Sequence, residues 1–533
     1  MGSQKTAFVK QAAILASAGL VVRLIGFAYR LPLTNLIGDE GNGIYAASFY
    51  LYMFFLIMSS AGLPAAISKM VSQRVALKQY RSAQRIFYVS LAVASVAGFV
   101  SASILYFGAE WLSVLVVNPR SKTAIQTLSP TVFIVAVMSV FRGYFQGMSN
   151  TVPTATSQFV EQVFNAIFSV YLAYILLPRG LAYAVAGATG AKGIGAVAGL
   201  AVLLGIYLLA LPVFRRRIQR FSKETTIEAP LSIARELLGT AAPIIVGTAI
   251  FSMTNLIDMQ MVMNILINNG HTNTEAYRLY GMLTGKYATL TTLPVSISTA
   301  FAVASIPSIA SSVALGKKAE ANRKINMALR LTMVLSIPAA VGIGVLANPI
   351  LLLLFPAHPE GGSLLQVGAV SIIFFALVQI TTGMLQGSGY VYIPAIAALC
   401  GALLKIPLNR LLIPIPQINV HGAVISTIAC CMVAAIIDLV MLKKKTGVRL
   451  DFMGFLLKPL ISSTAMGIGC FVFYHFIYFI VPSNTLATLA AILIGVVIYF
   501  GFMVIIRGLS EQDLNMIPGG QRLGHILRRY EFI

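Results

Sequence analysis

Residues 11–33 read QAAILASAGLVVRLIGFAYRLPL, an apolar run that carries two arginines, Arg23 and Arg30. The run is long enough to cross a bilayer as one helix, which takes about 20 apolar residues. On a helix the two arginines share one face and lie about 10 Å apart along its axis. A charged side chain at bilayer depth costs about 2.5–3.5 kcal/mol on insertion scales, so it faces a bundle interior or a watery cavity. We expect this face to meet an anionic group.

Similar apolar runs fill the rest of the chain. Of its 533 residues, 58% are hydrophobic and 10% are charged, whereas a soluble domain has about 25% charged residues. The short alternating segments of membrane strands are absent from the sequence. We therefore predict an all-α polytopic membrane protein. Its fourteen transmembrane helices are expected near residues 11–33, 43–68, 86–108, 124–147, 152–177, 193–214, 239–267, 279–311, 326–347, 364–387, 391–413, 420–442, 454–481 and 485–506.

The basic residues gather at the two ends of the chain and in the connections after spans two, six, eight and twelve, which all lie on one side of the membrane. Most of the 38 lysines and arginines lie there, and they account for the net charge of +22. Because basic loops stay on the cytoplasmic side, we expect both termini to be cytoplasmic, in a bacterial plasma membrane. The charge then sets orientation, and we expect no nucleic-acid partner.

An internal repeat relates the two halves of the chain. VALKQYRSAQR at 75–85 resembles VALGKKAEANR at 313–323. FRGYFQG at 141–147 resembles TTGMLQG at 381–387, at nearly the same offset. Spans 1–6 therefore pair with spans 7–12 in the same orientation, which is typical of an alternating-access transporter with its site between the halves. We predict two six-helix lobes, 1–222 and 223–450, two extra C-terminal helices in 451–507 and a cytoplasmic tail, 508–533.

The charges inside the predicted spans are mostly basic. They are Arg23, Arg30, Arg142, Lys286, Lys405 and Arg410, against the acidic Glu161, Asp258 and Asp438. A cation exporter needs buried carboxylates, so this balance favours an anionic substrate. A multidrug or organic-cation antiporter is the alternative.

Depth in the membrane separates the roles of these residues. Arg23 lies near the midplane, where its side chain cannot reach water, and we predict that it binds substrate. We predict the same for Lys286 and Lys405, which also lie within their spans. Arg30 either binds substrate or anchors the helix at the outer surface. The spans also hold two acids, Glu161 and Asp258, which either neutralise an arginine or carry a coupling cation or proton.

Three further charges lie near span ends. We expect Arg142 and Arg410 to extend to the membrane surface along their apolar stems. We expect Asp438 to be a helix-end residue or a partner of the adjacent loop.

Nothing in the sequence suggests an enzyme, a cofactor or a metal site. The four cysteines all lie in apolar spans without a Cys-x-x-Cys pattern, and the five histidines are scattered. We expect the cysteines to be small core residues. A Walker motif, paired catalytic acids and a large polar loop are all absent from the sequence.

Several stretches resemble the multidrug/oligosaccharidyl-lipid/polysaccharide (MOP) exporter superfamily. RLIGFAYR at 23–30 and IGDEGNGIY at 37–45 resemble its first-helix signature. AGLPAAISK at 61–69 and TNLID at 254–258 are similar to the branch of stage V sporulation protein B and MurJ-like flippases. The resemblance covers the whole chain.

This resemblance implies two six-helix lobes around a central cationic cavity. It also implies a substrate, an undecaprenyl-pyrophosphate-linked saccharide such as lipid II or a polysaccharide repeat unit, moved from the inner to the outer leaflet among the membrane lipids. In such proteins arginines of the first and eighth helices hold the pyrophosphate. Arg23 falls on the first of these, and Lys286 stands in the eighth helix, where lysine offers a point charge instead of a bidentate fork. The last two helices would form a groove for the lipid tail.

Overall fold

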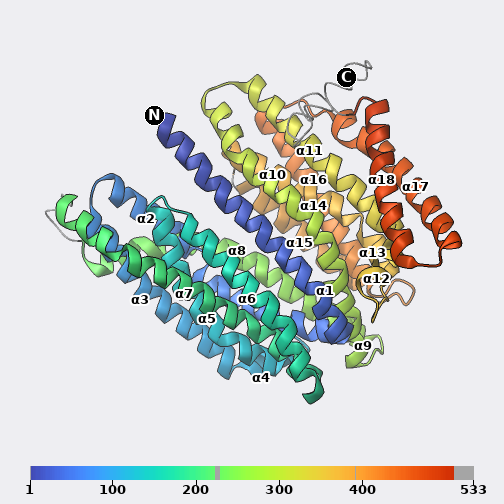
Figure 1. Ribbon diagram of the computed structural model, residues 1–533, viewed down its shortest axis with the longest axis horizontal. Helices are drawn as coiled ribbons and strands as arrows, with labels where there is room; N and C mark the ends of the chain where they lie inside the picture. The colour runs from blue at the N-terminus through green and yellow to red at the C-terminus, as the bar shows by residue number, and fades with distance from the viewer. Residues whose placement is uncertain (1, 222–227, 391, 509–533) are drawn as a thin grey trace. The chain divides into compact units, whose positions relative to one another are not determined.

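The computed structural model describes residues 2–221, 228–390 and 392–508 (Figure 1). Every regular element in these ranges is helical, which confirms the all-α prediction. Eleven helical segments of the described chain are long and apolar enough to cross a membrane, so this is a multi-pass membrane protein. A count of fourteen is compatible with this, since one of these segments contains two predicted spans and two more predicted spans coincide with long helices. The tail predicted for 508–533 lies almost wholly outside the described residues.

The chain forms two compact units, Met1–Gly281 and Met282–Ile533. The helices of unit 1 are α1 (Gly2–Ser60), α2 (Leu63–Ala76), α3 (Tyr80–Phe107), α4 (Ala109–Leu115), α5 (Lys122–Gly147), α6 (Val152–Leu176), α7 (Leu181–Phe221), α8 (Pro230–Asn268) and α9 (Asn273–Gly281). Because α8 packs on α1, α2 and α3, the seventh predicted span lies in unit 1. The lobe boundary at residue 222, which the repeat suggests, stays a prediction.

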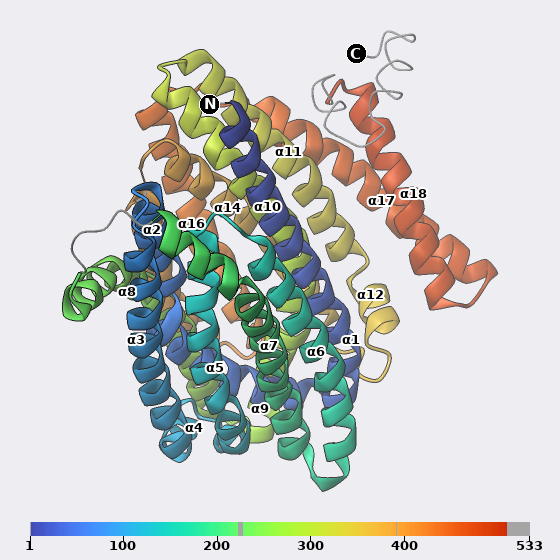
Figure 2. The same ribbon diagram turned by 60° about the vertical axis from the view of Figure 1, so that its left-hand side comes forward.

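Close packing of α3, α5, α6 and α7 forms the body of unit 1, and Figure 2 shows these helices side by side. Part of the core is aromatic. The Phe87 ring stacks on Tyr207 with centroids 4.9 Å apart and meets Phe141 edge-on at 5.1 Å. Offset and edge-on ring pairs add about 0.5–1.5 kcal/mol each beyond the area they bury.

The first helix contains a break that decides where its arginines lie. Residues 34–42, expected to connect two spans outside the membrane, are helical except at Gly38, which has φ 66° and ψ −174°. This combination suits only glycine, which has no Cβ. The chain turns at Gly38, and the two halves of α1 contact each other, with Arg30 against Tyr45. Helix α9 packs on this turn, where a Cβ on Gly43 would collide with the Tyr277 carbonyl group.

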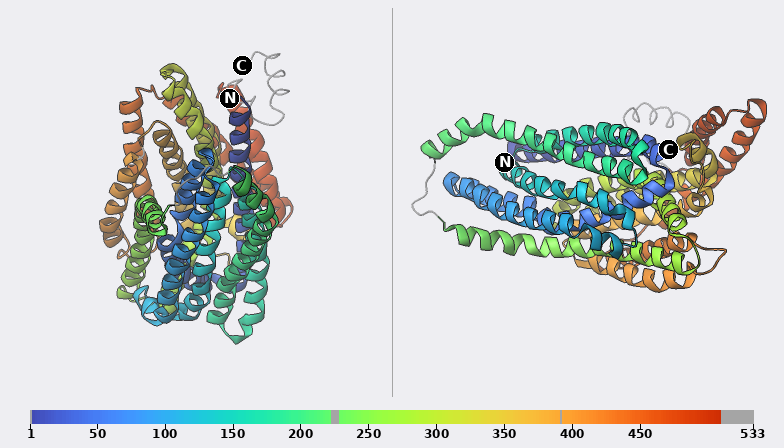
Figure 3. Two further views of the ribbon diagram at one scale, coloured as in Figure 1. Left: turned by 90° about the vertical axis from the view of Figure 1, so that its left-hand side faces the viewer. Right: turned by 90° about the horizontal axis from the view of Figure 1, so that it is seen from below.

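The elements of unit 2 are η3 (Met282–Tyr287), α10 (Ala288–Ala314), α11 (Lys318–Val345), α12 (Ala347–Leu354), α13 (Gly362–Gly368), α14 (Ser371–Gly387), α15 (Tyr392–Leu412), α16 (His421–Thr446), η4 (Met453–Leu457), α17 (Lys458–Ile480) and α18 (Asn484–Ile505). Helix α14 packs between α10 and α16, and α15 packs on α16. The last two helices pair with each other, and α17 also packs on α11 (Figure 3). They occupy one edge of unit 2, where Phe479 is 89% exposed, as suits a side chain that faces lipid.

Candidate functional site

Two cations of unit 1 lie on aromatic rings instead of on carboxylates. The Arg30 guanidinium lies 4.2 Å from the centre of the Tyr45 ring, and Tyr45 stacks on Phe49 with centroids 6.0 Å apart. The Lys192 ammonium group of α7 lies 5.1 Å from the Phe49 ring. We call Arg30, Tyr45, Phe49 and Lys192 the basic–aromatic cluster. Both cations are half-buried, and cation–π contacts are worth between about 0.5 kcal/mol at exposed sites and about 2 kcal/mol at desolvated ones.

The cluster keeps its positive charge available. Arg30 Nη1 is buried and has no hydrogen-bond partner. Within the described part of the chain, neither Arg30 nor Lys192 forms an ion pair with a carboxylate. The aromatic rings hold both cations in place without neutralising them, so the cluster is suited to receive an anion.

Arg23 and Asp258 lie on the same unit as this cluster. Arg23 is two turns before Arg30 on α1 and its side chain is exposed. Asp258 on α8 and Arg30 both act electrostatically on the Tyr50 hydroxyl group, which also interacts with Tyr280. Asp258 therefore brings a negative charge into the neighbourhood of the cluster.

Glu161 of α6 is bound to Arg142 of α5. The Arg142 Nη2 atom lies 2.7 Å from Glu161 Oε2, and Nε donates to Ser157 Oγ at 3.1 Å. The Arg142 side chain is only 13% exposed. The expectation that Arg142 extends to the membrane surface was therefore wrong, because the adjacent α6 presents an acid and a hydroxyl group within the bundle.

Lys286 and Lys405 occupy separate surroundings in unit 2. Lys286 is 2% exposed, and its Nζ donates to the Glu360 carbonyl at 2.9 Å and lies 3.9 Å from the Glu360 carboxylate. Lys405 of α15 is half-buried and acts electrostatically on Cys431 of α16. Arg410, farther along α15, is exposed.

Asp438 is a buried acid whose setting the sequence did not reveal. The residue is 1% exposed, so the expectation of a helix-end or loop-facing residue was wrong. Its Oδ2 atom lies 3.1 Å from Thr381 Oγ1 of α14, and Oδ1 is buried without a hydrogen bond. No pattern in the sequence pairs Asp438 with Thr381, because the two side chains meet only when α14 and α16 pack together.

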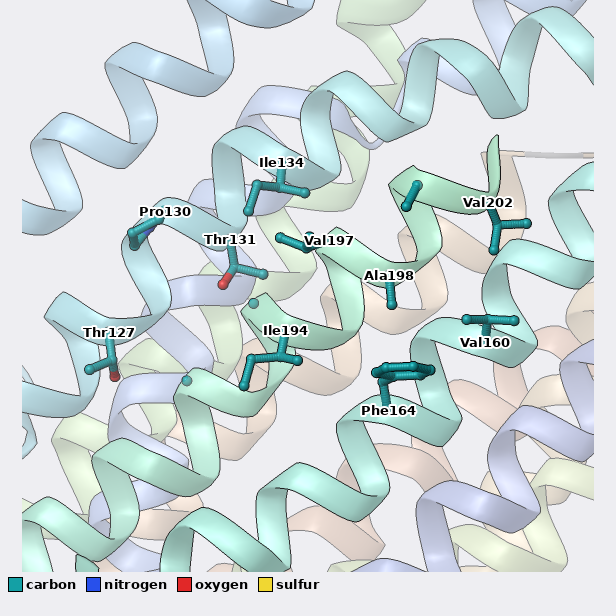
Figure 4. A pocket seen from close by; sticks show the side chains of 13 residues that line it. Thr127, Pro130, Thr131, Ile134, Val160, Phe164, Ile194, Val197, Ala198 and Val202 are labelled. Carbon is teal, nitrogen blue, oxygen red and sulfur yellow. The ribbon is translucent and has the colours of Figure 1, made fainter. Parts of the chain in front are cut away.

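An apolar groove of about 740 Å³ lies between α5, α6 and α7 of unit 1 (Figure 4). Its walls include Ile134, Phe164 and Val197, and its polar groups are the hydroxyls of Thr127 and Thr131. None of the sequence-predicted site residues lines it. Without a charge the groove suits a hydrocarbon chain and not a phosphate.

The cysteines and the other potential metal ligands do not form a site in the described residues. Cys431 and Cys470 are buried as expected, but Cys400 is exposed, and all four cysteines are free thiols. In residues 2–221, 228–390 and 392–508 no three His, Cys, Asp or Glu side chains come together.

Comparisons with known proteins support a transporter. The family model described as polysaccharide biosynthesis protein matches residues 8–313, and the MatE model matches residues 243–411. The lipid II flippase MurJ of Bacillus subtilis (strain 168) is 29% identical over 462 residues, which cover 81% of this chain and 82% of that protein. Stage V sporulation protein B of the same organism is 25% identical over 523 residues, covering 96% and 98%.

The fold agrees with these relatives. A solved structure of the lipid II flippase MurJ in an inward closed conformation matches with a TM-score of 0.69 at 16% identity, over 93% of this chain and 98% of that one. At this identity the match shows a shared fold. The relatives are transporters and not enzymes. Since the first family model spans more than half of the chain, this protein belongs to the polysaccharide biosynthesis protein family of the MOP exporter superfamily, in the branch of MurJ and stage V sporulation protein B.

Proposed function

We propose that this protein is a flippase that moves an anionic undecaprenyl-pyrophosphate-linked saccharide, such as lipid II or a polysaccharide repeat unit, across the bacterial plasma membrane by alternating access. One relative is a lipid II flippase, which supports a lipid-linked saccharide as cargo. The cycle breaks no bond, so the protein acts without catalysis.

The observation that carries this proposal is the basic–aromatic cluster. A guanidinium group pairs with phosphate oxygens through two parallel hydrogen bonds, and an ammonium group adds a compact point charge. Arg30 has a buried nitrogen without a partner, and Lys192 is held nearby on Phe49. A pyrophosphate that reached these groups would satisfy both cations, and the aromatic rings would exclude water from the contact.

The remaining predicted residues take roles around this cluster. We assign pyrophosphate binding to Arg23 and Arg30 of unit 1 and to Lys286 and Lys405 of unit 2. Because Lys286 is 2% exposed, its ammonium group must become more accessible before it can bind a phosphate. Asp258 moderates the charge near Arg30, and Glu161 balances Arg142.

The second candidate is a multidrug or organic-cation antiporter. The MatE family model, which matches residues 243–411, favours it. In that case Asp258 would bind the cationic drug and the arginines would serve the structure. The two candidates differ in the sign of the substrate's charge.

Depletion of the protein in its host tests the proposal. We expect a lipid-linked saccharide to accumulate on the inner leaflet, and re-expression of the natural protein to clear it. Arg30→Ala should fail to clear it, whereas Arg410→Ala, which removes an exposed arginine of α15, should succeed. If no lipid-linked intermediate accumulates and the cells become sensitive to cationic dyes instead, the antiporter is correct.

A further inference from the structure

Asp438 lies in an apolar environment between α14 and α16. Ala435 and Leu442 of its own helix belong to the hydrophobic core of unit 2, together with Ile380 and Met384 of α14. The Asp438 residue as a whole is 1% exposed. An ionised carboxylate in such a place costs several kcal/mol unless a cation pairs with it.

No cation pairs with Asp438 in the described chain. The groups that act on it are the hydroxyls of Thr381 and Thr382. Helices α13 and α14, which pack on α16, carry no titratable residue. Helix α15 carries Tyr392, Cys400, Lys405 and Arg410, and α16 itself carries His421, Cys430, Cys431 and Lys443 to Lys445, none of which forms an ion pair with Asp438.

Hydrogen-bond accounting favours a neutral acid. Thr381 has one hydroxyl hydrogen, and its Oγ1 lies 2.7 Å from the Leu377 carbonyl and 3.1 Å from Asp438 Oδ2. If the hydrogen points to Leu377, as is usual for a threonine within a helix, the contact with Asp438 needs a hydrogen from the acid. A protonated Asp438 supplies it, whereas an ionised Asp438 forces Thr381 to release Leu377.

The internal repeat gives an independent comparison. The motif of α5 places Arg142 where the matching motif of α14 has Thr382. In unit 1 the arginine neutralises Glu161 at 2.7 Å. In unit 2 the matching helix also faces an acid, Asp438, which is not the repeat counterpart of Glu161 and is the more deeply buried of the two, but this helix offers only hydroxyl groups. The acid of unit 1 is neutralised by a fixed arginine. The acid of unit 2 has no such partner in the described chain, so a mobile ion such as a proton would have to neutralise it.

We propose that Asp438 is a proton-binding site and that it couples transport to the proton gradient. The coupling rests on the proposed function, whereas the proton site does not. In this proposal the buried carboxyl group, as described here, carries the proton. When it opens to water, the carboxyl group gives its proton to a water molecule, becomes a carboxylate and takes the Thr381 hydrogen away from Leu377. Asp438 lies eight residues, about 12 Å along the axis, before Thr446 at the end of α16.

Infrared spectroscopy of the full-length protein in liposomes tests the proton site without any substrate. We expect a carboxylic-acid carbonyl band that disappears as the pH rises, and we expect Asp438→Asn to lack this band. Glu110→Gln is the matched control, because Glu110 on α4 is exposed and accepts a hydrogen bond from Lys122, which holds the pKa of that carboxyl below its usual value. This control should keep the band.

Reconstituted transport of fluorescent lipid II tests the coupling. With one proton per cycle, a gradient of one pH unit should change the accumulation ratio about tenfold in the natural protein. Asp438→Asn should show no response to the gradient, and Asp438→Glu should restore part of it. If Asp438→Asn does not fold, Thr381→Val keeps the acid and should move the pH at which the band disappears.

Each result decides one question. The proposal is overturned if Asp438→Asn keeps the band or the tenfold response, if Thr381→Val leaves the band's pH dependence unchanged, or if the band is absent and sodium ions alone drive transport. If the band is present and specific to Asp438 but the natural protein does not move lipid II under any gradient, the proton site stands and the flippase proposal fails for that substrate.

Discussion

Burial of a charged side chain carries a desolvation cost, and three residues of this chain meet that cost in different ways. Arg142 is paired with Glu161, Arg30 lies on the Tyr45 ring, and Asp438 has only hydroxyl groups beside it. An ion pair fixes a charge, a ring holds a cation without cancelling it, and a hydroxyl group accommodates both states of an acid. The three settings therefore suggest a structural, a substrate-binding and a proton-binding role.

Glu161→Gln tests the structural role. It leaves the 13%-exposed Arg142 without its partner, and breaking a buried pair in this way costs about 3–5 kcal/mol. We expect a loss near the lower end of that range, since the Glu161 side chain is 28% exposed. Thermal unfolding in detergent measures it. The double variant Arg142→Met with Glu161→Met should recover most of the loss, and equal losses in the single and double variants would count against the pair.

Arg23→Ala tests the arginine that the sequence alone favoured. Arg23 and Arg30 share a face of α1, and we expect the loss of either charge to weaken pyrophosphate binding. A single charge-assisted hydrogen bond is worth about 1.5–3 kcal/mol, so the substrate concentration for half-maximal transport should rise by roughly ten- to a hundred-fold. Growth at natural expression levels gives the readout. Full complementation by Arg23→Ala, with Arg30→Ala inactive, would remove Arg23 from the site.

At the scale of elements, the break in α1 brings the site together. Gly38 turns the chain, and Tyr45 and Phe49 then return beside Arg30. The sequence alone predicts two separate spans with an external connection, because one apolar run ends at residue 33 and the next begins at residue 43. It could not show that α9 packs on residues 34–42 and keeps them helical, since that contact joins positions more than two hundred residues apart.

Gly38→Ala tests the break. A Cβ at φ 66° and ψ −174° is strained, at a cost of about 1–3 kcal/mol. We expect a lower unfolding temperature together with reduced transport. The control is Gly19→Ala on the same helix, where a Cβ would meet nothing within 4 Å. Here alanine should be neutral or stabilising, because it has the better helix propensity. Equal behaviour of the two variants would contradict the assigned role of Gly38.

The limits of sequence reasoning are clearest for Arg142 and Asp438. Their positions along the predicted spans follow from the sequence, but such a position does not say which neighbour a side chain faces. Arg142 faces Glu161 and Asp438 faces Thr381, and both pairings depend on how helices pack. By contrast, helix content and the transporter family followed from composition and local motifs, which need no knowledge of packing.

At the scale of the whole molecule, the distribution of basic residues predicts cytoplasmic termini. Single cysteines in a cysteine-free background test this orientation. Glu110→Cys, in α4, should react with an impermeant maleimide added to intact cells, because this connection is expected outside. Lys317→Cys, between α10 and α11, should react only after the membrane is opened. Both side chains are well exposed, at 78% and 59%. The reverse labelling pattern would invert the topology.

Reconstituted flipping measures directly whether the chain moves a lipid-linked pyrophosphate. Purified protein in liposomes is given fluorescent lipid II on one leaflet, and a membrane-impermeant quencher reports its arrival on the other. We expect protein-dependent flipping that Arg30→Ala slows at least tenfold and Arg410→Ala leaves unchanged. No flipping above empty liposomes, with an organic cation transported in its place, would contradict this expectation.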